Sequence, residues 1–121
     1  MAYRQSIGRY GEDLACRHLE EQGYEIITRN WRCQRGEIDI VAREGDCLAF
    51  VEVKTRRGHR VGYPEDAMTA SKRRRLGELA GWYLAEQDLS DVDWRVDLVA
   101  IELSEGSGPM RVNLVRTVRE L

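Results

Sequence analysis

The chain has 121 residues, of which 42% are hydrophobic and 33% charged, and its formal net charge is −2 at neutral pH. This length and composition predict one soluble globular domain over residues 1–121, large enough to bury its own core. They exclude a polycation held on nucleic acid by its overall charge, and no apolar run approaches the roughly 18 residues of a membrane span.

The first predicted elements are a helix over residues 6–22 and a strand over residues 24–29. Hydrophobic residues recur at three- and four-residue spacing in the helix, as expected of one buried face; they are Ile7, Tyr10, Leu14, Ala15 and Leu19. Gly23 is expected to end the helix, because glycine readily adopts the left-handed conformation found after helix C-termini.

Two strands, residues 36–42 and 48–55, come next and face each other across a short turn. The pair Gly45-Asp46 has the glycine-first pattern of a type II′ turn, which pairs Glu44 with Cys47. Counting back along both strands sets Asp39 directly opposite Glu52. Cross-strand neighbours have Cβ atoms roughly 4.5–5.5 Å apart, so this register brings two carboxylates together inside otherwise apolar strands.

Alternation along a strand decides which side chains share a face of the sheet. Glu52 and Lys54 share a face with Phe50, opposite Val51 and Val53. On the preceding strand, Asp39 is expected to share a face with Glu37 and Val41. The opposite face of that strand is expected to hold Ile38, Ile40 and Ala42.

The remaining chain predicts a second helix and two further strands. The expected ranges are a loop at 58–70, a helix at 71–86, a strand at 94–102, a loop at 104–109 and a strand at 112–118. The order α-β-β-β-α-β-β predicts an α/β fold with a mixed β-sheet flanked by helices. Asp97 could approach the acidic pair, but pairing with a basic residue is the interpretation that we favour.

The acidic pair points to metal-assisted chemistry. Carboxylates are hard oxygen ligands that suit Mg²⁺ or Mn²⁺ rather than zinc, so Asp39 and Glu52 are predicted metal ligands. A bound cation lowers the pKa of a water and stabilises charge on a transferring phosphoryl group, and Lys54 would lie beside that water. This arrangement suits phosphodiester hydrolysis, although a Glu-x-Lys pair on a strand also occurs as a surface charge pair.

Two basic clusters, residues 54–60 and 72–75, hold eight of the 19 basic residues and predict a local anion-binding surface. Lys72 is expected to lean toward the sheet, with Arg73 and Arg74 facing solvent. The predicted nucleic-acid-binding residues are Arg56, Arg57, Lys72, Arg73 and Arg74. The alternative is that these runs are simply solvated faces. Trp31, Trp82 and Trp94 could stack on bases, but large aromatic residues are more often part of the core.

The order of these motifs resembles the PD-(D/E)xK nuclease superfamily. Four stretches, residues 11–15, 30–32, 36–39 and 50–56, look like the small bacterial YraN family, which is taken to be related to archaeal Holliday-junction resolvases. The resemblance covers nearly the whole chain, and the stretch from Phe50 to Lys54 is its most specific part. One departure is that Ile38 stands where the superfamily has a proline, which weakens the literal match of the motif more than its chemistry.

The resemblance implies a restriction-endonuclease-like core and a role for each matching residue. Asp39 and Glu52 would be metal ligands, Lys54 the catalytic lysine and Glu12 an auxiliary acidic residue. Glu12 borders the inward stripe of the first predicted helix, although a surface glutamate is the commoner reading of such a position. A core of this type often needs a second copy to act on two strands, so a homodimer accompanies the expectation.

The sequence therefore predicts a Mg²⁺- or Mn²⁺-dependent endonuclease-like protein that acts on DNA rather than RNA. Recognition of structure rather than sequence is expected, because no helix-turn-helix or zinc-finger pattern is present to read bases. The alternatives are a non-catalytic nucleic-acid-binding module on a nuclease scaffold and a structural partner in a larger assembly. The cysteines Cys16, Cys33 and Cys47 are widely spaced and lack a Cys-x-x-Cys pair, which favours a reduced, cytoplasmic setting.

Overall fold

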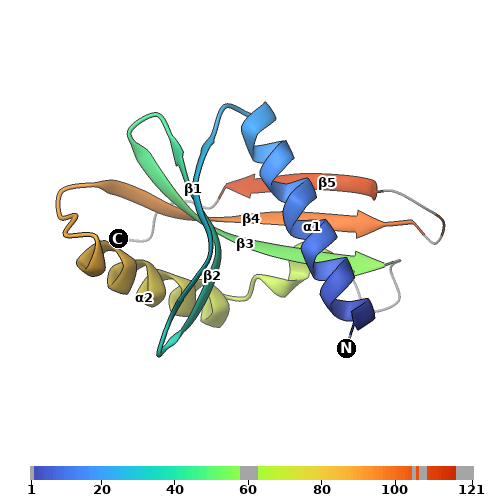
Figure 1. Ribbon diagram of the computed structural model, residues 1–121, viewed down its shortest axis with the longest axis horizontal. Helices are drawn as coiled ribbons and strands as arrows, with labels where there is room; N and C mark the ends of the chain where they lie inside the picture. The colour runs from blue at the N-terminus through green and yellow to red at the C-terminus, as the bar shows by residue number, and fades with distance from the viewer. Residues whose placement is uncertain (1, 58–62, 105, 107–108, 117–121) are drawn as a thin grey trace.

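A mixed five-stranded sheet with one helix on each face builds the fold (Figure 1). The computed structural model describes residues 2–57, 63–104, 106 and 109–116. Its elements are α1 (Ala2–Glu21), β1 (Glu25–Cys33), β2 (Gly36–Glu44), β3 (Cys47–Arg57), the 3₁₀ helix η1 (Pro64–Ala67), α2 (Ala70–Glu86), β4 (Asp93–Leu103) and β5 (Pro109–Arg116). The predicted α/β class and the order α-β-β-β-α-β-β are confirmed.

The strands lie in the order β1-β2-β3-β4-β5, so every strand pairs with its neighbour in the sequence. All pairs are antiparallel except β3 and β4, which are parallel and are connected through η1 and α2. A parallel pair needs a crossover of this length, whereas antiparallel neighbours need only a turn. No helix in the described part of the chain is long and apolar enough to cross a membrane.

Each helix covers a separate hydrophobic core. In Figure 1, α1 crosses the sheet over β3, β4 and β5, while α2 lies on the opposite side. The α1-side core contains Ala15, Cys16, Leu19, Tyr24, Ile40, Ala42, Ala49, Val51, Val99, Ile101 and Leu103. The α2-side core contains Ile38, Val41, Leu48, Phe50, Leu76, Leu79, Ala80, Tyr83 and Val96. Because both faces of β3 and β4 are buried, these strands read as nearly continuous apolar runs.

The end of α1 is fixed by Gly23, as predicted. Gly23 has a φ of 94°, and its N–H donates to the Glu20 carbonyl at 3.0 Å. The N–H of Tyr24 donates to the Leu19 carbonyl at 2.9 Å. These two bonds form a Schellman motif, which satisfies carbonyl groups left over at the helix end. At the other helix, Thr69 Oγ1 caps α2 by accepting from the Lys72 N–H at 3.1 Å.

Two strand boundaries differ by three or more residues from those expected, and the other differences are of one or two residues. β1 continues to Cys33 rather than ending at residue 29, because it still pairs with β2 beyond Asn30, whose φ is 55°. β5 begins at Pro109, at the first position of a strand, where the missing N–H costs little. Val118, which was expected in the last strand, lies outside the described residues, as do His59 and Arg60 of the first basic cluster.

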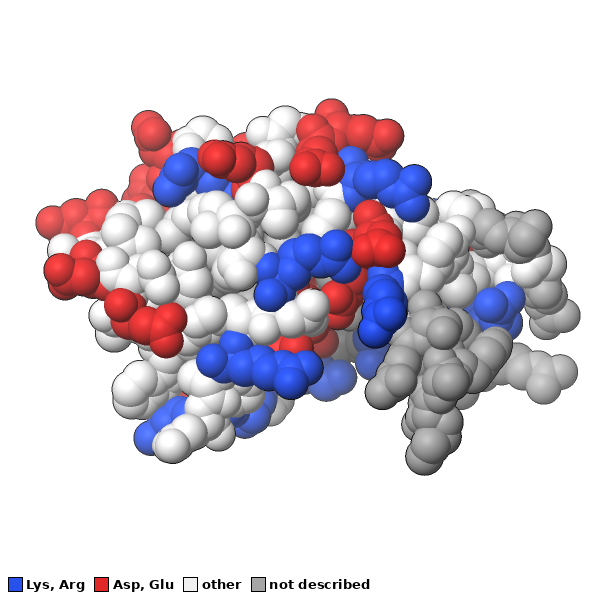
Figure 2. Space-filling model, in the orientation of Figure 1, with Lys and Arg blue, Asp and Glu red and all other residues white. Residues whose placement is uncertain are grey.

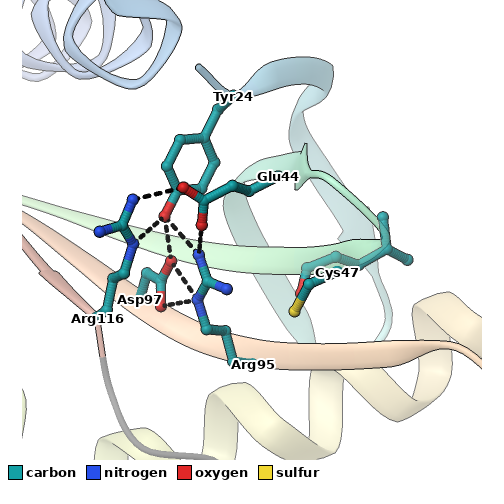
Figure 3. Close-up of polar contacts among 7 residues, drawn as sticks. Tyr24, Glu44, Cys47, Arg95, Asp97 and Arg116 are labelled. Carbon is teal, nitrogen blue, oxygen red and sulfur yellow. Dashed lines mark hydrogen bonds and ion pairs between the residues drawn. The ribbon is translucent and has the colours of Figure 1, made fainter. Parts of the chain in front are cut away.

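A partly buried polar cluster joins Tyr24, the residue before β1, to the end of β2 and to β4 and β5 (Figure 3). The phenol of Tyr24 donates to Asp97 Oδ2 at 3.1 Å and accepts from Arg95 Nη2 at 2.6 Å and Arg116 Nε at 3.0 Å. Glu44 accepts from the same two guanidinium groups, at 2.6 Å each. Asp97 is fully buried and also accepts from Arg95. Asp97 therefore pairs with a basic residue, as we favoured.

Candidate active site

The β2–β3 turn has the predicted geometry and sets the register of the acidic strands. Gly45 has a φ of 61°, whereas the φ of Asp46 is not positive. A type II′ turn requires this combination at its two central residues. Glu44 pairs with Cys47, and the pairing continues to Ile40 opposite Val51. One further step along each strand leads to Asp39 and Glu52.

The backbone ladder between β2 and β3 stops at this step. Ile40–Val51 is its last pair, and beyond it the N–H of Val53 donates to the side chain of Asp39, at 2.8 Å from Oδ2. A carboxylate oxygen therefore takes the place of a backbone carbonyl. This bond fixes the orientation of the Asp39 side chain at the point where the two strands separate.

The expected face of Ile38 is wrong, because β2 changes faces at Asp39. Ile38 packs in the α2-side core, whereas Ile40 packs in the α1-side core. On the neighbouring strand, the pairs Arg29–Ile40 and Trp31–Ile38 flank Asn30, the residue with positive φ. Irregular strand geometry of this kind redirects side chains and is frequent beside active sites. Asp39 therefore lies at the irregularity rather than in a regular strand.

Burial is the largest effect on the pKa of both acids. Burial and then the negative charge of Glu52 raise the pKa of Asp39 from 3.8 to about 7. Burial also raises the pKa of Glu52, against the opposing effect of the Lys72 and Lys54 charges. Among the described residues, neither carboxylate forms an ion pair.

Lys54 and Glu12 line one cavity together with Asp39. A cavity of about 520 Å³ is lined by Gly8, Glu12, Asp39, Val53, Lys54, Thr55 and Arg56. Burial lowers the pKa of Lys54, and the positive charges of Arg56 and Lys72 lower it further. Three of the four predicted catalytic residues therefore share one cavity.

Gly11 allows α1 to bring Glu12 to this position. A Cβ added at Gly11 would lie 2.2 Å from Thr55 Oγ1, so a side chain here would collide with β3. Glu12 Oε1 accepts from Asn30 Nδ2 at 3.1 Å and lies 3.5 Å from Arg29 Nη2. Gly11 and Asn30 lie in stretches that resemble the family, but the sequence gave neither of them a role. A positive φ at asparagine is a known tendency, but the sequence gives no sign of which helix it faces.

Glu52 lines a different cavity, on the α2 side. This cavity, of about 180 Å³, is also lined by Glu37, Lys72 and Arg75 together with Met68, Leu76 and Leu79. Lys72 is the largest favourable charge acting on Glu52, as its predicted lean toward the sheet requires. Asp39 and Glu52 thus line different cavities, yet they are close enough for the charge of Glu52 to raise the pKa of Asp39.

The predicted basic residues are not all equally close to the acids. Arg56 lines the Asp39 cavity and Lys72 the Glu52 cavity. Arg57 Nη1 donates to the Ser104 carbonyl at 2.6 Å, and Arg73 and Arg74 line a separate cavity along α2. Figure 2 shows Lys and Arg side chains gathered around acidic atoms at the centre of one face, with further acidic side chains along its upper and left margins.

Comparison with known proteins identifies the family of the chain. A model of the family described as "Uncharacterised protein family UPF0102" matches residues 11–101. A UPF0102 protein from Rhodococcus opacus is 50% identical over 109 residues, which cover 90% of this chain and 92% of that protein. One from Beutenbergia cavernae is 47% identical over 118 residues, covering 98% and 99%. One from Caldicellulosiruptor saccharolyticus is 38% identical over 113 residues, covering 93% and 96%. The chain therefore belongs to the uncharacterised protein family UPF0102.

Proposed function

We propose that this chain is a Mg²⁺- or Mn²⁺-dependent endonuclease-like protein of the PD-(D/E)xK superfamily, which hydrolyses DNA phosphodiesters. One observation carries the proposal: two half-buried carboxylates, Asp39 and Glu52, repel each other where β2 and β3 separate, with Lys54 beside them. Repelling buried charges are costly in a structural role. Such a pair of carboxylates is useful where a cation is to be bound, because the cation offsets their repulsion and can also bind a phosphate.

The donor set fits a hard divalent cation. Asp39 and Glu52 offer carboxylate oxygens, and a positive charge near them would favour the ionised forms that burial disfavours. No group of three or more His, Cys, Asp or Glu side chains able to share a metal occurs in the described part of the chain. Mg²⁺ typically binds to one or two carboxylates and retains several waters. When bound, such a cation supplies charge stabilisation and a water of lowered pKa.

Lys54 has the chemistry needed next to a scissile phosphate. Its ammonium group can donate three hydrogen bonds and offset the negative charge that develops on phosphate oxygens. Burial and neighbouring cations lower its pKa, which makes transfer of its proton easier at neutral pH. In this proposal, Lys54 orients the attacking water and stabilises the transition state.

Glu12 and its partners complete the site on the α1 side. Hydrogen bonding from Asn30, with Arg29 close by, holds the Glu12 carboxylate in place. It lines the same cavity as Asp39 and Lys54, where a carboxylate oxygen can accept a hydrogen bond from a water. Glu12 is therefore proposed as a positioning residue.

The basic residues near the acids favour binding that depends on the structure of the DNA rather than on its sequence. Arg56 and Lys72 flank the acids and would contact phosphate oxygens, which carry no sequence information. Binding through phosphates releases counterions and is therefore strongly salt-dependent. DNA shape and strand separation would decide which phosphodiester reaches the acids.

The test is Mg²⁺- or Mn²⁺-dependent cleavage of linear, single-stranded, flapped and four-way-junction DNAs. Wild type is expected to cut at least one substrate, and Glu52→Gln none. Asp46→Asn is a matched control, because Asp46 is an exposed acid in the same hairpin, outside both cavities. If wild type binds these DNAs but cuts none, the non-catalytic binding module becomes the better description. If it neither binds nor cuts them, the proposal fails.

A further inference from the structure

Trp82 differs from the other two tryptophans in its surroundings. Trp31 and Trp94 are partly buried and pack edge-on against Tyr83 and Phe50, with ring centroids 5.5 and 5.8 Å apart. Trp82 lies on α2 with 48% of its surface exposed. The expectation that the tryptophans belong to the core therefore does not hold for Trp82. A large exposed indole is a common feature of binding surfaces.

Arg35, at the tip of the β1–β2 hairpin, places its guanidinium group over the Trp82 ring. The guanidinium carbon of Arg35 lies 4.8 Å from the centroid of the Trp82 ring, within the range of a cation–π interaction. Arg75 Nη2 donates to the Arg35 carbonyl at 2.6 Å and so ties the hairpin tip to α2. Gly36 permits this approach, because an added Cβ would lie 3.1 Å from Arg75 Nη2.

These residues line a cavity next to the one that contains Glu52. The Trp82 cavity, of about 230 Å³, is lined by Arg35, Arg75, Glu78, Leu79 and Trp82. Arg75 and Leu79 also line the cavity of Glu52 and Lys72. A ligand that places a phosphate near Glu52 and Lys72 can therefore extend past Arg75 to the indole.

We propose that Trp82 and Arg35 form a stacking site for one unpaired nucleobase of a DNA strand, next to the phosphate at the acidic site. This inference rests on the proposed function, because that function places the strand there. An indole ring and a planar guanidinium are the groups on which unpaired bases stack. Glu78 disfavours a second phosphate in this cavity, whereas its carboxylate can accept a hydrogen bond from a base amino group.

The proposed occupant is an unpaired base because a paired one would first have to leave its stack. Bases in a duplex stack on their neighbours, and taking one out of the stack costs a few kcal/mol. Single strands, flaps and junction openings offer bases without that full cost. The proposal thus gives a physical reason for structure selection: the Trp82 site favours DNA in which a base beside the scissile phosphate is free.

The test measures DNA binding in a chelator, by fluorescence anisotropy, so that cleavage plays no part. The probes are a labelled single strand of mixed sequence and an abasic strand of the same length, which keeps the phosphates but has no bases. Trp82→Ala should weaken binding of the mixed-sequence strand by about 5- to 150-fold, the loss typical of one base–aromatic stack. Binding of the abasic strand should be unchanged.

Two further variants control for general effects. Trp82→Phe keeps an aromatic ring and should bind the mixed-sequence strand much more tightly than Trp82→Ala. Tyr63→Ala removes a comparably exposed aromatic residue, 54% exposed with the Arg111 guanidinium 5.8 Å from its ring. Because Tyr63 lines neither the Trp82 cavity nor the Glu52 cavity, binding by Tyr63→Ala should match wild type.

The outcomes separate this inference from the proposed function. If wild type binds both strands and Trp82→Ala binds the mixed-sequence strand equally well, the stacking site is wrong and the nuclease proposal stands. An equal loss on the abasic strand would show that Trp82 supports only backbone binding, which also overturns the stacking site. If wild type binds neither strand, the stacking site is wrong, while the nuclease proposal is decided separately by the cleavage panel.

Discussion

Replacing Asp39 by asparagine should make the metal-free protein more stable at neutral pH. Asparagine has nearly the same shape, and its side-chain oxygen can still accept the hydrogen bond from the Val53 N–H. The substitution removes the charge that burial and Glu52 disfavour. It therefore isolates the electrostatic cost of the acidic site from its packing.

The magnitude follows from the shift in the Asp39 pKa, from 3.8 to about 7. Each pKa unit corresponds to about 1.36 kcal/mol, so the shift amounts to at most about 4 kcal/mol. Because the folded-state pKa is raised, the folded protein binds more protons between these two values, and wild-type stability falls as pH rises through them. Asp39→Asn lacks this loss. The variant and wild type should be about equally stable below the lower value and differ by up to about 4 kcal/mol above the higher one.

Urea unfolding in a chelator, repeated from about pH 4 to about pH 8, measures this difference. The matched control is Asp46→Asn, an exposed acid in the turn of the same hairpin, whose stability curve should run parallel to that of wild type. Parallel curves for Asp39→Asn and wild type would refute the reasoning, because they would show that Asp39 ionises as an ordinary surface carboxylate.

Adding Mn²⁺ should reverse the order of stability. A ligand that binds only the folded state stabilises it in proportion to the logarithm of its concentration relative to Kd, so wild type and Asp46→Asn should gain stability with Mn²⁺. Asp39→Asn should gain much less, since one of the two proposed ligands is altered. Equal Mn²⁺ affinity of Asp39→Asn and wild type, measured by calorimetry, would refute the assignment of Asp39 as a ligand.

Three further predictions concern the groups around the site. Gly11→Ala should lower the free energy of unfolding, measured by urea denaturation, by about 1–3 kcal/mol, as overpacking does. Because the added Cβ would collide with Thr55 Oγ1, adding Thr55→Ala should restore part of this stability; no restoration would exclude that collision. Arg56→Ala should reduce the slope of log affinity for DNA against log salt by about 1. Arg57→Ala should change this slope less in the same binding assay, because the guanidinium of Arg57 donates to a backbone carbonyl. Equal effects of the two substitutions would count against this distinction. Tyr24→Phe should destabilise the protein by about 1–3 kcal/mol, measured by urea denaturation, because buried partners lose the phenol; unchanged stability would contradict this.

The sequence predicted the elements that depend on local patterns. The three- and four-residue spacing of Ile7, Tyr10 and Leu14 identified α1, and Gly23 marked its end. The pair Gly45-Asp46 gave the turn and hence the pairing of β2 with β3. These features follow from the preferences of a few adjacent residues, so reading them needs no knowledge of the tertiary structure.

The features that were missed depend on contacts between distant parts of the chain. Strict alternation put Ile38 on the wrong face, because the irregularity at Asp39 accompanies a positive φ at Asn30 on the neighbouring strand. The role of Gly11 is visible only against Thr55. Trp82 fits a helix position equally well inside or outside the core, and only the packing of α2 decides between them.

The sharpest measurement is the single-turnover cleavage rate of Lys54→Met with saturating Mn²⁺, on whichever DNA the wild type cuts. Methionine keeps a long apolar side chain but has no charge and no N–H donors, and Lys54 is proposed to act on the phosphate or water rather than on the metal. The variant should bind Mn²⁺ like wild type and bind DNA only modestly less tightly. Its cleavage rate should fall by roughly 10²–10³-fold, as when an electrostatic donor is removed from a transition state. A rate equal to that of wild type would show that Lys54 is only a surface charge and would contradict the proposed nuclease site.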